Sequence, residues 1–586
     1  MAETSFLQRY AEELGALKRR AARFALSHPK IAGRLRISGE QVDDPHVERM
    51  IQSFAFASAR VRQKLDDEFP ELTGSMLETL YPHYLAPVPS MMMVRAHPVA
   101  GLDSVQDLPR HSEISCEPIE EERCRFRTTQ GIDILPVRVA RAQLQAQPIE
   151  APLAPRLGAA ACLRILVEPL APVPSVASLK LKRLPFHIEA PFREASRLHE
   201  LILNHTLGIA LARHADDREP LFLPAGSVTP GGFRVEEGML PYPPASFTGY
   251  RLLSEFFALP QKFLFFELSG LDRWKGDALE IFFYLDRADP ALERMVAATN
   301  FTLNAAPAVN LFAQRAEPIV VDGRRTEYAL VPDARRHRTR EVYSVEGVTL
   351  TDRTGTRRES RSFFAGGASH TPAWQLRREF DDLDGTSDVS IAFDGEDEQE
   401  LVAGVDTLCL NRDLPERLPF GGGHPHLDLV RASSSVSGVE AISAPTPVMR
   451  LSEAEDRRWR LISHLNLNHL SLASGDGTAL KEMLRLYVLP ERREPNLMID
   501  AIVGVSARSA VSRVSGGGIV PGTEVTLTFE PGLIERGPAY LFASVIDRFL
   551  GLYANINSFT RLTATMRGQA EPVAAFPARL AERPLL

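Results

Sequence analysis

The chain has 586 residues, more than the roughly 250 to 300 residues at which one hydrophobic core stops growing, so several domains are expected. Hydrophobic residues make up 44% and charged residues 24% of the sequence, which argues against a largely disordered protein. The net charge is only −8 and the basic residues are scattered, so the composition does not favour binding to nucleic acid or to an anionic membrane.

The amino-terminal 20 residues are charged throughout and lack the apolar segment of a secretory signal. No run approaches the ~18 apolar residues of a membrane span. The cysteines have no metal-binding spacing and fit a reducing compartment; they are Cys116, Cys124, Cys162 and Cys409. We therefore expect a cytoplasmic protein that is not inserted in a membrane and that carries no metal or cofactor.

Two helices are predicted near the amino terminus. Apolar residues recur at steps of three and four from Phe6 to Phe24, which indicates an amphipathic helix that ends near Pro29. Asp44 followed by Pro45 is typical of the N-cap and first residue of a second helix. One face of this helix carries Val47, Met50, Phe54, Ala57, Val61 and Leu65. We predict a helical arm over residues 1–90.

A proline-rich joint follows these helices. Residues 65–72 read LDDEFPEL and residues 80–90 read LYPHYLAPVPS. Because Pro70 and Pro82 lack the amide hydrogen that continues a helix, we expect two short helices to end there and a stiff, extended segment to begin.

The middle of the chain combines strand and helix patterns. Short β-branched runs after Pro89 predict a sheet, and Arg193 to Ala212 predicts a helix within it. Further predictions are a helix from Leu252, buried strands at 263–270 and 278–285, and a short helix capped by Asp289 and Pro290. A mixed α+β domain is therefore expected over residues 91–300.

Two more domains complete the expected architecture. Residues 301–450 are predicted to form a β-rich, loop-rich domain, with loops and short strands over 351–443. Residues 451–586 are predicted to form an α/β domain with helices at 478–487 and 540–553 and strands at 501–505 and 524–529. The fold class is thus α+β multidomain, with an amino-terminal helical arm, mixed β-rich domains and a carboxy-terminal α/β domain.

Motifs that carry chemistry are incomplete in this sequence. His199 and His205 diverge by about 240° on a helix, so they cannot hold one metal ion together. Asp381 to Gly385 lacks both end ligands of a calcium loop. The GGGHPH run at Gly421 to His426 and the SGGG run at Ser515 to Gly518 indicate flexible turns and lack the lysine and hydroxyl of a phosphate loop.

Carboxylates are abundant, but no spacing singles out an acid and base pair, and no nucleophile elbow is intact. A multidomain β-rich hydrolase with an unrecognised active site stays open as the alternative function. The strongest basic cluster contains Arg335 and Arg336; because aromatic residues are not interleaved, a solvated face or a protein contact is favoured over nucleic acid.

Three blocks of sequence resemble one family. The LDDEFPE and YPHYLAPVPS motifs, the block over 284–345 that contains Asn300-Phe301-Thr302-Leu303-Asn304, and Asn557-Ser558-Phe559 are similar to the TssF family (also ImpG or VasA) of type VI secretion baseplate subunits. The blocks are spread over nearly the whole chain.

The resemblance implies a structural subunit without catalysis. Family members join in paired TssF copies with TssG to form a wedge, wedges surround the VgrG spike, and TssK connects them to the inner-membrane complex, with TssE and the sheath nearby. The resemblance also implies that a helical stripe packs against TssG, whereas an isolated amphipathic helix usually packs into its own domain. Candidate partner contacts are Phe6, Tyr10, Leu14, Leu17, Arg335 and Arg336.

Overall fold

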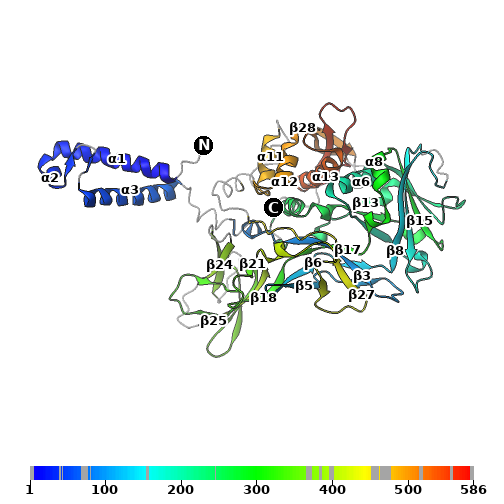
Figure 1. Cartoon of the computed structure of the whole chain (residues 1–586), viewed down its shortest axis with the longest axis horizontal. Coiled ribbons are helices and arrows are strands. Elements are labelled where there is room, and N and C mark those ends of the chain that lie inside the picture. The colour runs from blue at the N-terminus through cyan, green and yellow to red at the C-terminus, as the bar shows by residue number, and fades with distance from the viewer. Residues whose placement is uncertain are drawn as a thin grey trace. The chain divides into compact units, whose positions relative to one another are not determined.

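A computed structural model describes residues 6–38, 41–42, 44–66, 77–78, 81–152, 158–243, 246–363, 372–381, 386–394, 401–450, 461, 477–513, 519–554 and 558–580. The chain divides into two compact units, one formed by residues 1–77 with 453–462 and the other by 78–452 with 463–586. Figure 1 labels their elements. Several predictions concern residues outside the described part, namely most of the LDDEFPE motif, the start of the last domain near 451, the SGGG run and Asn557.

The first unit is built on two helices, α1 (Phe6–Ser27) and α3 (Pro45–Asp66), which pack against each other (Figure 1). Tyr10 lies near Phe56 and Lys18 lies near Glu48, so the two helices run antiparallel and form a helical hairpin. The carboxylate of Asp44 accepts a 2.8 Å hydrogen bond from the His46 amide, as expected for the predicted N-cap. Short elements join the helices: α2 (Pro29–Arg34), β1 (Ile37–Ser38) and β2 (Gln41–Val42).

A closed barrel forms one core of the second unit. Its strands follow the order β17-β3-β27-β26-β5-β6. They are β3 (Met91–Pro98), β5 (Glu113–Ile119), β6 (Glu122–Thr128), β17 (Ala305–Val309), β26 (Leu427–Leu429) and β27 (Val436–Ala441). The ranges 91–300 and 301–450, predicted as separate domains, therefore share this barrel. Alternation of apolar residues predicts which side chains face inward, but it does not identify the neighbouring strand.

Two antiparallel sheets lie in sequence between the barrel strands β6 and β17. One sheet has the order β12-β11-β15-β9-β8 and the other the order β13-β14-β10-β16. Their strands are β8 (Val137–Ala146), β9 (Ala161–Pro169), β10 (Arg183–Ile188), β11 (Thr206–Ala212), β12 (Leu221–Pro224), β13 (Val228–Pro230), β14 (Phe265–Ser269), β15 (Leu279–Leu285) and β16 (Phe301–Thr302). A separate pair joins β4 (Gln106–Leu108) and β7 (Ile132–Ile134).

The helix predicted over Arg193–Ala212 is only partly correct. Helix α6 (Phe192–Asn204) ends before Thr206, and the remaining residues form β11, which pairs with β15. The apolar run after Asn204 fits either a helix or a buried strand, and its sheet partners decide the outcome. The other predictions in this region are confirmed by the strands β14 and β15 and by the helices α7 (Thr248–Ala258) and α8 (Pro290–Met295).

Residues 312–410 form two further sheets. Loops and short strands were expected over 351–443, but the strands at 373–381, 386–394 and 401–410 have 9, 9 and 10 residues. The orders of the two sheets are β18-β25-β21-β22, with β19 on β25, and β20-β24-β23. The strands are β18 (Phe312–Arg315), β19 (Ile319–Val321), β20 (Tyr328–Ala329), β21 (Glu341–Thr351), β22 (Arg357–Ser360), β23 (Ala373–Asp381), β24 (Thr386–Asp394) and β25 (Leu401–Leu410). Polar residues on the outer faces of these strands weaken the strand signal in the sequence.

The carboxy-terminal part places helices beside a mixed sheet. Helix α13 (Arg536–Leu552) connects the parallel strands β29 (Ile519–Phe529) and β30 (Phe559–Met566), and most of its residues are buried. It packs against α6 and α7, as well as against β30. The remaining elements are α11 (Thr478–Arg485), α12 (Arg493–Asp500), β28 (Ile502–Arg513), β31 (Ala574–Ala575) and β32 (Arg579–Leu580).

The proline joint is confirmed only in part. Pro82 does not end a helix; it occupies the first turn of the short helix α5 (Pro82–Leu85), where a missing amide hydrogen costs nothing. The chain leaves α5 at Ala86 in an extended conformation and continues toward β3.

Candidate interaction surfaces

Small apolar side chains are buried where α3 faces α1. Ala55 and Ala59 on α3 are fully buried and lie one helical turn apart, so the small side chains permit a close approach between helices. The ring of Tyr10 meets that of Phe56 edge to face, with centroids 6.4 Å apart, and Lys18 lies 3.0 Å from Glu48. These contacts fix the side of α3 that faces α1.

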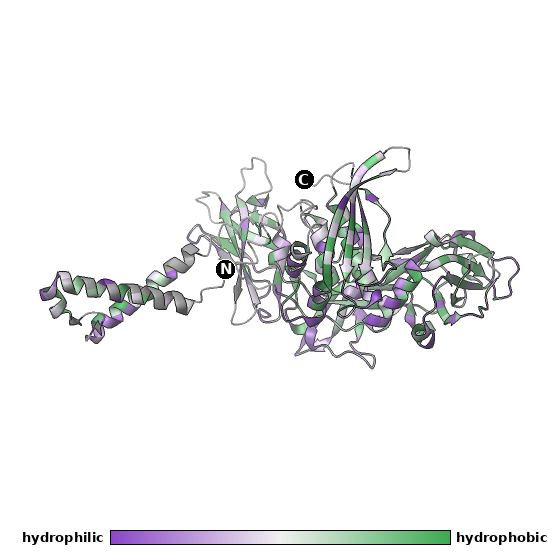
Figure 2. Cartoon of the chain, turned by 90° about the horizontal axis from the view of Figure 1, so that it is seen from above, coloured by the Kyte–Doolittle hydropathy of each residue, from purple (hydrophilic) through white to green (hydrophobic). Residues whose placement is uncertain are grey.

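The opposite side of α3 exposes large apolar side chains. Met50 is 72% and Phe54 is 65% exposed, and at 100° per residue the two lie about 40° apart on the helix. Ala59 lies about 140° to 180° around from them. Figure 2 shows hydrophilic and hydrophobic residues interspersed along the coloured parts of the hairpin. Met50 and Phe54, called the outer stripe below, therefore face away from α1.

The predicted contacts on α1 have a different environment. Tyr10, Leu14 and Leu17 are half-buried, and Tyr10 is already in contact with α3. The side chain of Phe6 lies outside the described residues. The apolar stripe of α1 thus contributes to the hairpin itself, whereas the outer stripe is the more exposed apolar feature. The apolar periodicity of α3 detected this stripe but did not show which face α1 covers.

The two predicted basic contacts are not equivalent. Arg336 places its Nε 3.0 Å from the carboxylate of Glu122, and the buried Arg340 places Nη2 3.2 Å from the same carboxylate. Arg335 is exposed and follows a turn in which its amide bonds to Asp333. Arg336 is therefore engaged in holding this loop against β6, and Arg335 is the more accessible of the two.

The histidines of the α6 region have structural partners. Burial lowers the pKa of His199 to about 3 and keeps it neutral. His205 lies between Asp286, 2.7 Å from Nδ1, and Glu200, 3.3 Å from Nε2. Glu200 also accepts a 2.7 Å hydrogen bond from Arg536. The described residues that line the adjacent pocket include no serine, threonine or cysteine, so this pocket offers no hydroxyl or thiol nucleophile.

The YPHY motif packs into an aromatic cluster. The ring of Tyr250 lies 5.7 Å from that of Tyr81 and 5.5 Å from that of Tyr487, and His83 lies 3.6 Å from Tyr242. Burial, with a smaller contribution from the Arg251 charge, lowers the pKa of His83 to about 3. A neutral, buried imidazole fits a packing role. The motif therefore connects the start of the second unit to segments near residues 250 and 487.

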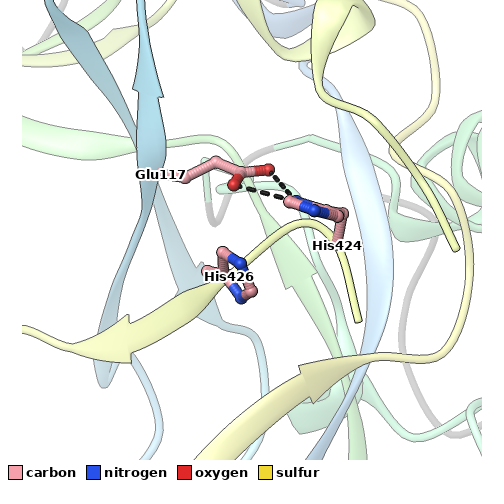
Figure 3. Close-up of side chains that lie close together, drawn as sticks. All are labelled: Glu117, His424 and His426. Carbon is pink, nitrogen blue, oxygen red and sulfur yellow. Dashed lines mark hydrogen bonds and ion pairs between the residues drawn. The ribbon is translucent and has the colours of Figure 1, made fainter. Parts of the chain in front are cut away.

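One group among the described residues has the composition and closeness of a metal site. Glu117, His424 and His426 each offer a ligand atom within 4.8 Å of the others (Figure 3). The sequence pattern predicts only a flexible glycine turn for residues 421–426. Because Glu117 lies 307 residues before His424, a local sequence motif could not identify Glu117 as a neighbour of the two histidines.

The helices within the described ranges contain no segment of the length and hydropathy needed to cross a membrane.

Comparison with known proteins decides the family. The model of the family described as "Type VI secretion system, TssF" matches residues 2–583. The chain belongs to the TssF family. The chain is also 34% identical to the type VI secretion system component TssF1 of Pseudomonas aeruginosa over 627 residues, covering 99% of both proteins.

Solved structures agree with membership of the TssF family. A chain of the TssK-TssF-TssG baseplate subcomplex of the type VI secretion system superposes with a TM-score of 0.76 and 26% identity, over 92% of this chain and 99% of that one. A chain from the type VI baseplate complex gives a TM-score of 0.61 at 21% identity, over 99% of this chain and all of the other, which shows a shared fold.

Proposed function

We propose that the chain is a structural subunit of the type VI secretion baseplate wedge and that it assembles with TssG and TssK. The observation that carries this proposal is the likeness over 92% of the chain to a chain of a TssK-TssF-TssG subcomplex, together with the family match over residues 2–583. A subunit of this kind acts by presenting interfaces of fixed geometry, and it needs no reacting group.

The helical hairpin is the proposed binding element for TssG. The outer stripe supports this assignment, because Met50 and Phe54 point away from α1, the helix that packs on α3. Covering each of these side chains would contribute about 1.5 to 3 kcal/mol of binding free energy. Tyr10, Leu14 and Leu17 are proposed as a second TssG contact on the α1 side of the hairpin, and Phe6 is proposed with them from the sequence alone.

The same proposal includes finer features of the assembly. The amino-terminal helical arm and the carboxy-terminal α/β domain would be separate binding elements, and a second TssF copy, TssE and the VgrG spike would be further partners. The chain would act in the cytoplasm, in a baseplate docked on the inner-membrane complex and supporting sheath and tube assembly. Arg335 and Arg336 are proposed as a secondary protein contact, with Arg335 as the accessible member.

An enzymatic role is not part of the proposal. The alternative, a β-rich hydrolase, requires a nucleophile or a pair of carboxylates in a cleft. The carboxylates that line the pocket at His205 are each paired with an arginine instead: Glu200 with Arg536, Asp289 with Arg197 and Glu535 with Arg193. The structural role of the family favours the same conclusion.

Co-expression tests the proposed function. The full chain, TssG and TssK of the same secretion system should co-purify through an affinity tag on TssG and remain together during size-exclusion chromatography. Recovery of the folded chain in the unbound fraction, with TssG and TssK recovered without it, would overturn the proposal.

A further inference from the structure

We propose that Glu117, His424 and His426 form a binding site for a divalent transition-metal ion such as Zn²⁺ at the rim of the barrel. The site takes one carboxylate from β5 and two imidazoles from the segment that precedes β26 (Figure 3). Carboxylate and imidazole are zinc ligands, and a pair of imidazoles favours zinc, copper or nickel over magnesium or calcium.

Local backbone structure positions the histidines. Gly421 and His424 exchange two backbone hydrogen bonds, of 3.1 and 3.2 Å, around a two-residue turn. The central residues of this turn, Gly422 and Gly423, have φ values of 63° and 91°, which glycine adopts without strain and which a type I′ turn requires. The amide of Glu117 then donates a 3.0 Å hydrogen bond to the carbonyl of His426. The GGGHPH run is therefore a defined turn that is attached to β5.

The carboxylate is positioned by an irregularity in the barrel. The pairing register between β5 and β6 shifts between Ser115 and Pro118, so Glu117 lies in a bulge. Bulges at barrel rims redirect side chains out of the regular alternation. Figure 3 shows the Glu117 carboxylate directed at the His424 ring, with His426 beside them.

The distances suit a metal that enters between the side chains. Nδ1 of His424 lies 2.9 Å from both carboxylate oxygens of Glu117, and the His424 and His426 ring centroids are 4.5 Å apart. Two ligands of a tetrahedral zinc ion lie roughly 3.3 Å apart when each bond is about 2.0 to 2.1 Å long. All three ligand atoms already lie within 4.8 Å of one another, so small side-chain rotations would complete the site.

The charges and exposure of the group favour occupancy. The Glu117 side chain is 18% and that of His424 is 42% exposed, so an ion can enter without unfolding the barrel. Arg123 donates to the Cys116 carbonyl at 3.1 Å and Arg417 pairs with Glu120 at 2.6 Å, so both guanidinium groups have partners other than Glu117. Three protein ligands leave one coordination position for water. The ion would fasten the turn at 421–424 to the seam where β26 pairs with β5.

The test measures zinc binding to the untagged full-length chain by equilibrium dialysis against ZnCl₂, followed by elemental analysis. The wild-type chain should bind about one zinc ion per chain at this site. His426→Ala and Glu117→Gln should bind that ion at least tenfold more weakly. His97→Ala is the matched control, because His97 also pairs with a glutamate, Glu440 at 3.0 Å, but does not belong to a three-ligand group.

Two outcomes would overturn the site: a wild-type chain that binds no stoichiometric zinc, or a His426→Ala chain that binds it with unchanged affinity. Because His426 is exposed, His426→Ala should keep the wild-type circular dichroism spectrum and melting temperature in the absence of metal. Zinc should raise the melting temperature of the wild-type and His97→Ala chains and leave that of His426→Ala unchanged.

Discussion

Tyr10 of α1 meets Phe56 of α3 edge to face, with the ring centroids 6.4 Å apart. This contact, together with the pair between Lys18 and Glu48, sets the antiparallel register of the helical hairpin. It also determines which apolar side chains are packed between the two helices and which remain exposed. Met50 and Phe54 are left exposed, so substitutions can address the exposed and the packed apolar residues separately.

Charges on the outer stripe should disrupt TssG binding without unfolding the hairpin. The double substitution Met50→Asp and Phe54→Asp places carboxylates where apolar contact is proposed, so affinity for TssG should fall at least tenfold, which corresponds to about 1.4 kcal/mol. Affinity can be measured by biolayer interferometry with immobilised TssG. Phe222→Asp, at an exposed position on β12, is the control and should bind as wild type. Equal affinity of the double variant and the control would remove the outer stripe from the interface.

Substitution of the α1 contacts should affect hairpin folding as well as binding. Tyr10→Ala removes an aromatic pair worth about 0.5 to 1.5 kcal/mol, so hydrogen exchange of α1 and α3 amides should accelerate. Leu14→Asp should weaken TssG binding and leave exchange in the second unit unchanged. Unchanged exchange and unchanged binding in both variants would assign these side chains to neither the hairpin contact nor the interface.

A buried ion pair should be important for stability of the second unit. Nη2 of Arg450 lies 2.6 Å from the carboxylate of Glu341, whose side chain is fully buried. Arg450→Met removes the ion-pair partner of that carboxylate, which keeps its hydrogen bonds from Ser387, and also breaks the pair of Arg450 with Asp413; it should destabilise the fold by about 3 to 5 kcal/mol, measured by urea unfolding. Arg138→Met is the control: it breaks an exposed pair with Glu168, 2.8 Å long, and should cost about 0 to 1 kcal/mol. Equal losses of unfolding free energy in Arg450→Met and Arg138→Met would contradict the larger contribution assigned to the buried pair.

The same pair predicts a pH dependence. Burial alone would raise the pKa of Glu341, but hydrogen bonds and charge from Arg450 outweigh burial and lower it. A lowered folded-state pKa stabilises the protein above the unfolded value of about 4.3, and this stabilisation is lost as the pH falls through the folded-state pKa. The difference in melting temperature between wild type and Glu341→Gln should therefore be largest near pH 7 and shrink below about pH 4. A difference that is constant from pH 7 to pH 3 would contradict this assignment.

The two exposed-loop arginines should behave differently when their charge is reversed. Arg335→Glu should change stability by less than about 0.5 kcal/mol, because the side chain is exposed. If Arg335 contacts a partner protein, Arg335→Glu should weaken that binding most at low salt, where charges are least screened. Arg336→Glu brings a carboxylate to the position now 3.0 Å from Glu122 and should lower the melting temperature. If Arg335→Glu lowers stability as much as Arg336→Glu, the proposed division of roles is wrong.

Local elements were predictable where one face of a segment meets the core. The N-cap pattern of Asp44 and Asp289 and the apolar faces of α1 and α13 are local signals, and each corresponds to a helix in the structure. The end of α6 was not predictable in the same way, because the apolar residues after Asn204 become a strand only through pairing with β15.

Long-range pairing limits what the sequence can show of the sites. The barrel joins β3 to β27 and β5 to β26, although more than 300 residues separate the paired segments. Glu117 and His424 become neighbours only through this closure. The apolar periodicity of α3 was visible in the sequence, but the exposure of Met50 depends on α1 packing on the opposite face.

The mass of the complex formed with TssG is the decisive measurement for the proposed role as a wedge subunit. When the chain is co-expressed with TssG and purified, size-exclusion chromatography with light scattering should give one species that contains TssG and two copies of the 64.9 kDa chain. The outer-stripe double variant should shift mass from this species to the free chain. A folded wild-type chain that elutes at 64.9 kDa while TssG elutes separately would contradict the proposed role as a wedge subunit.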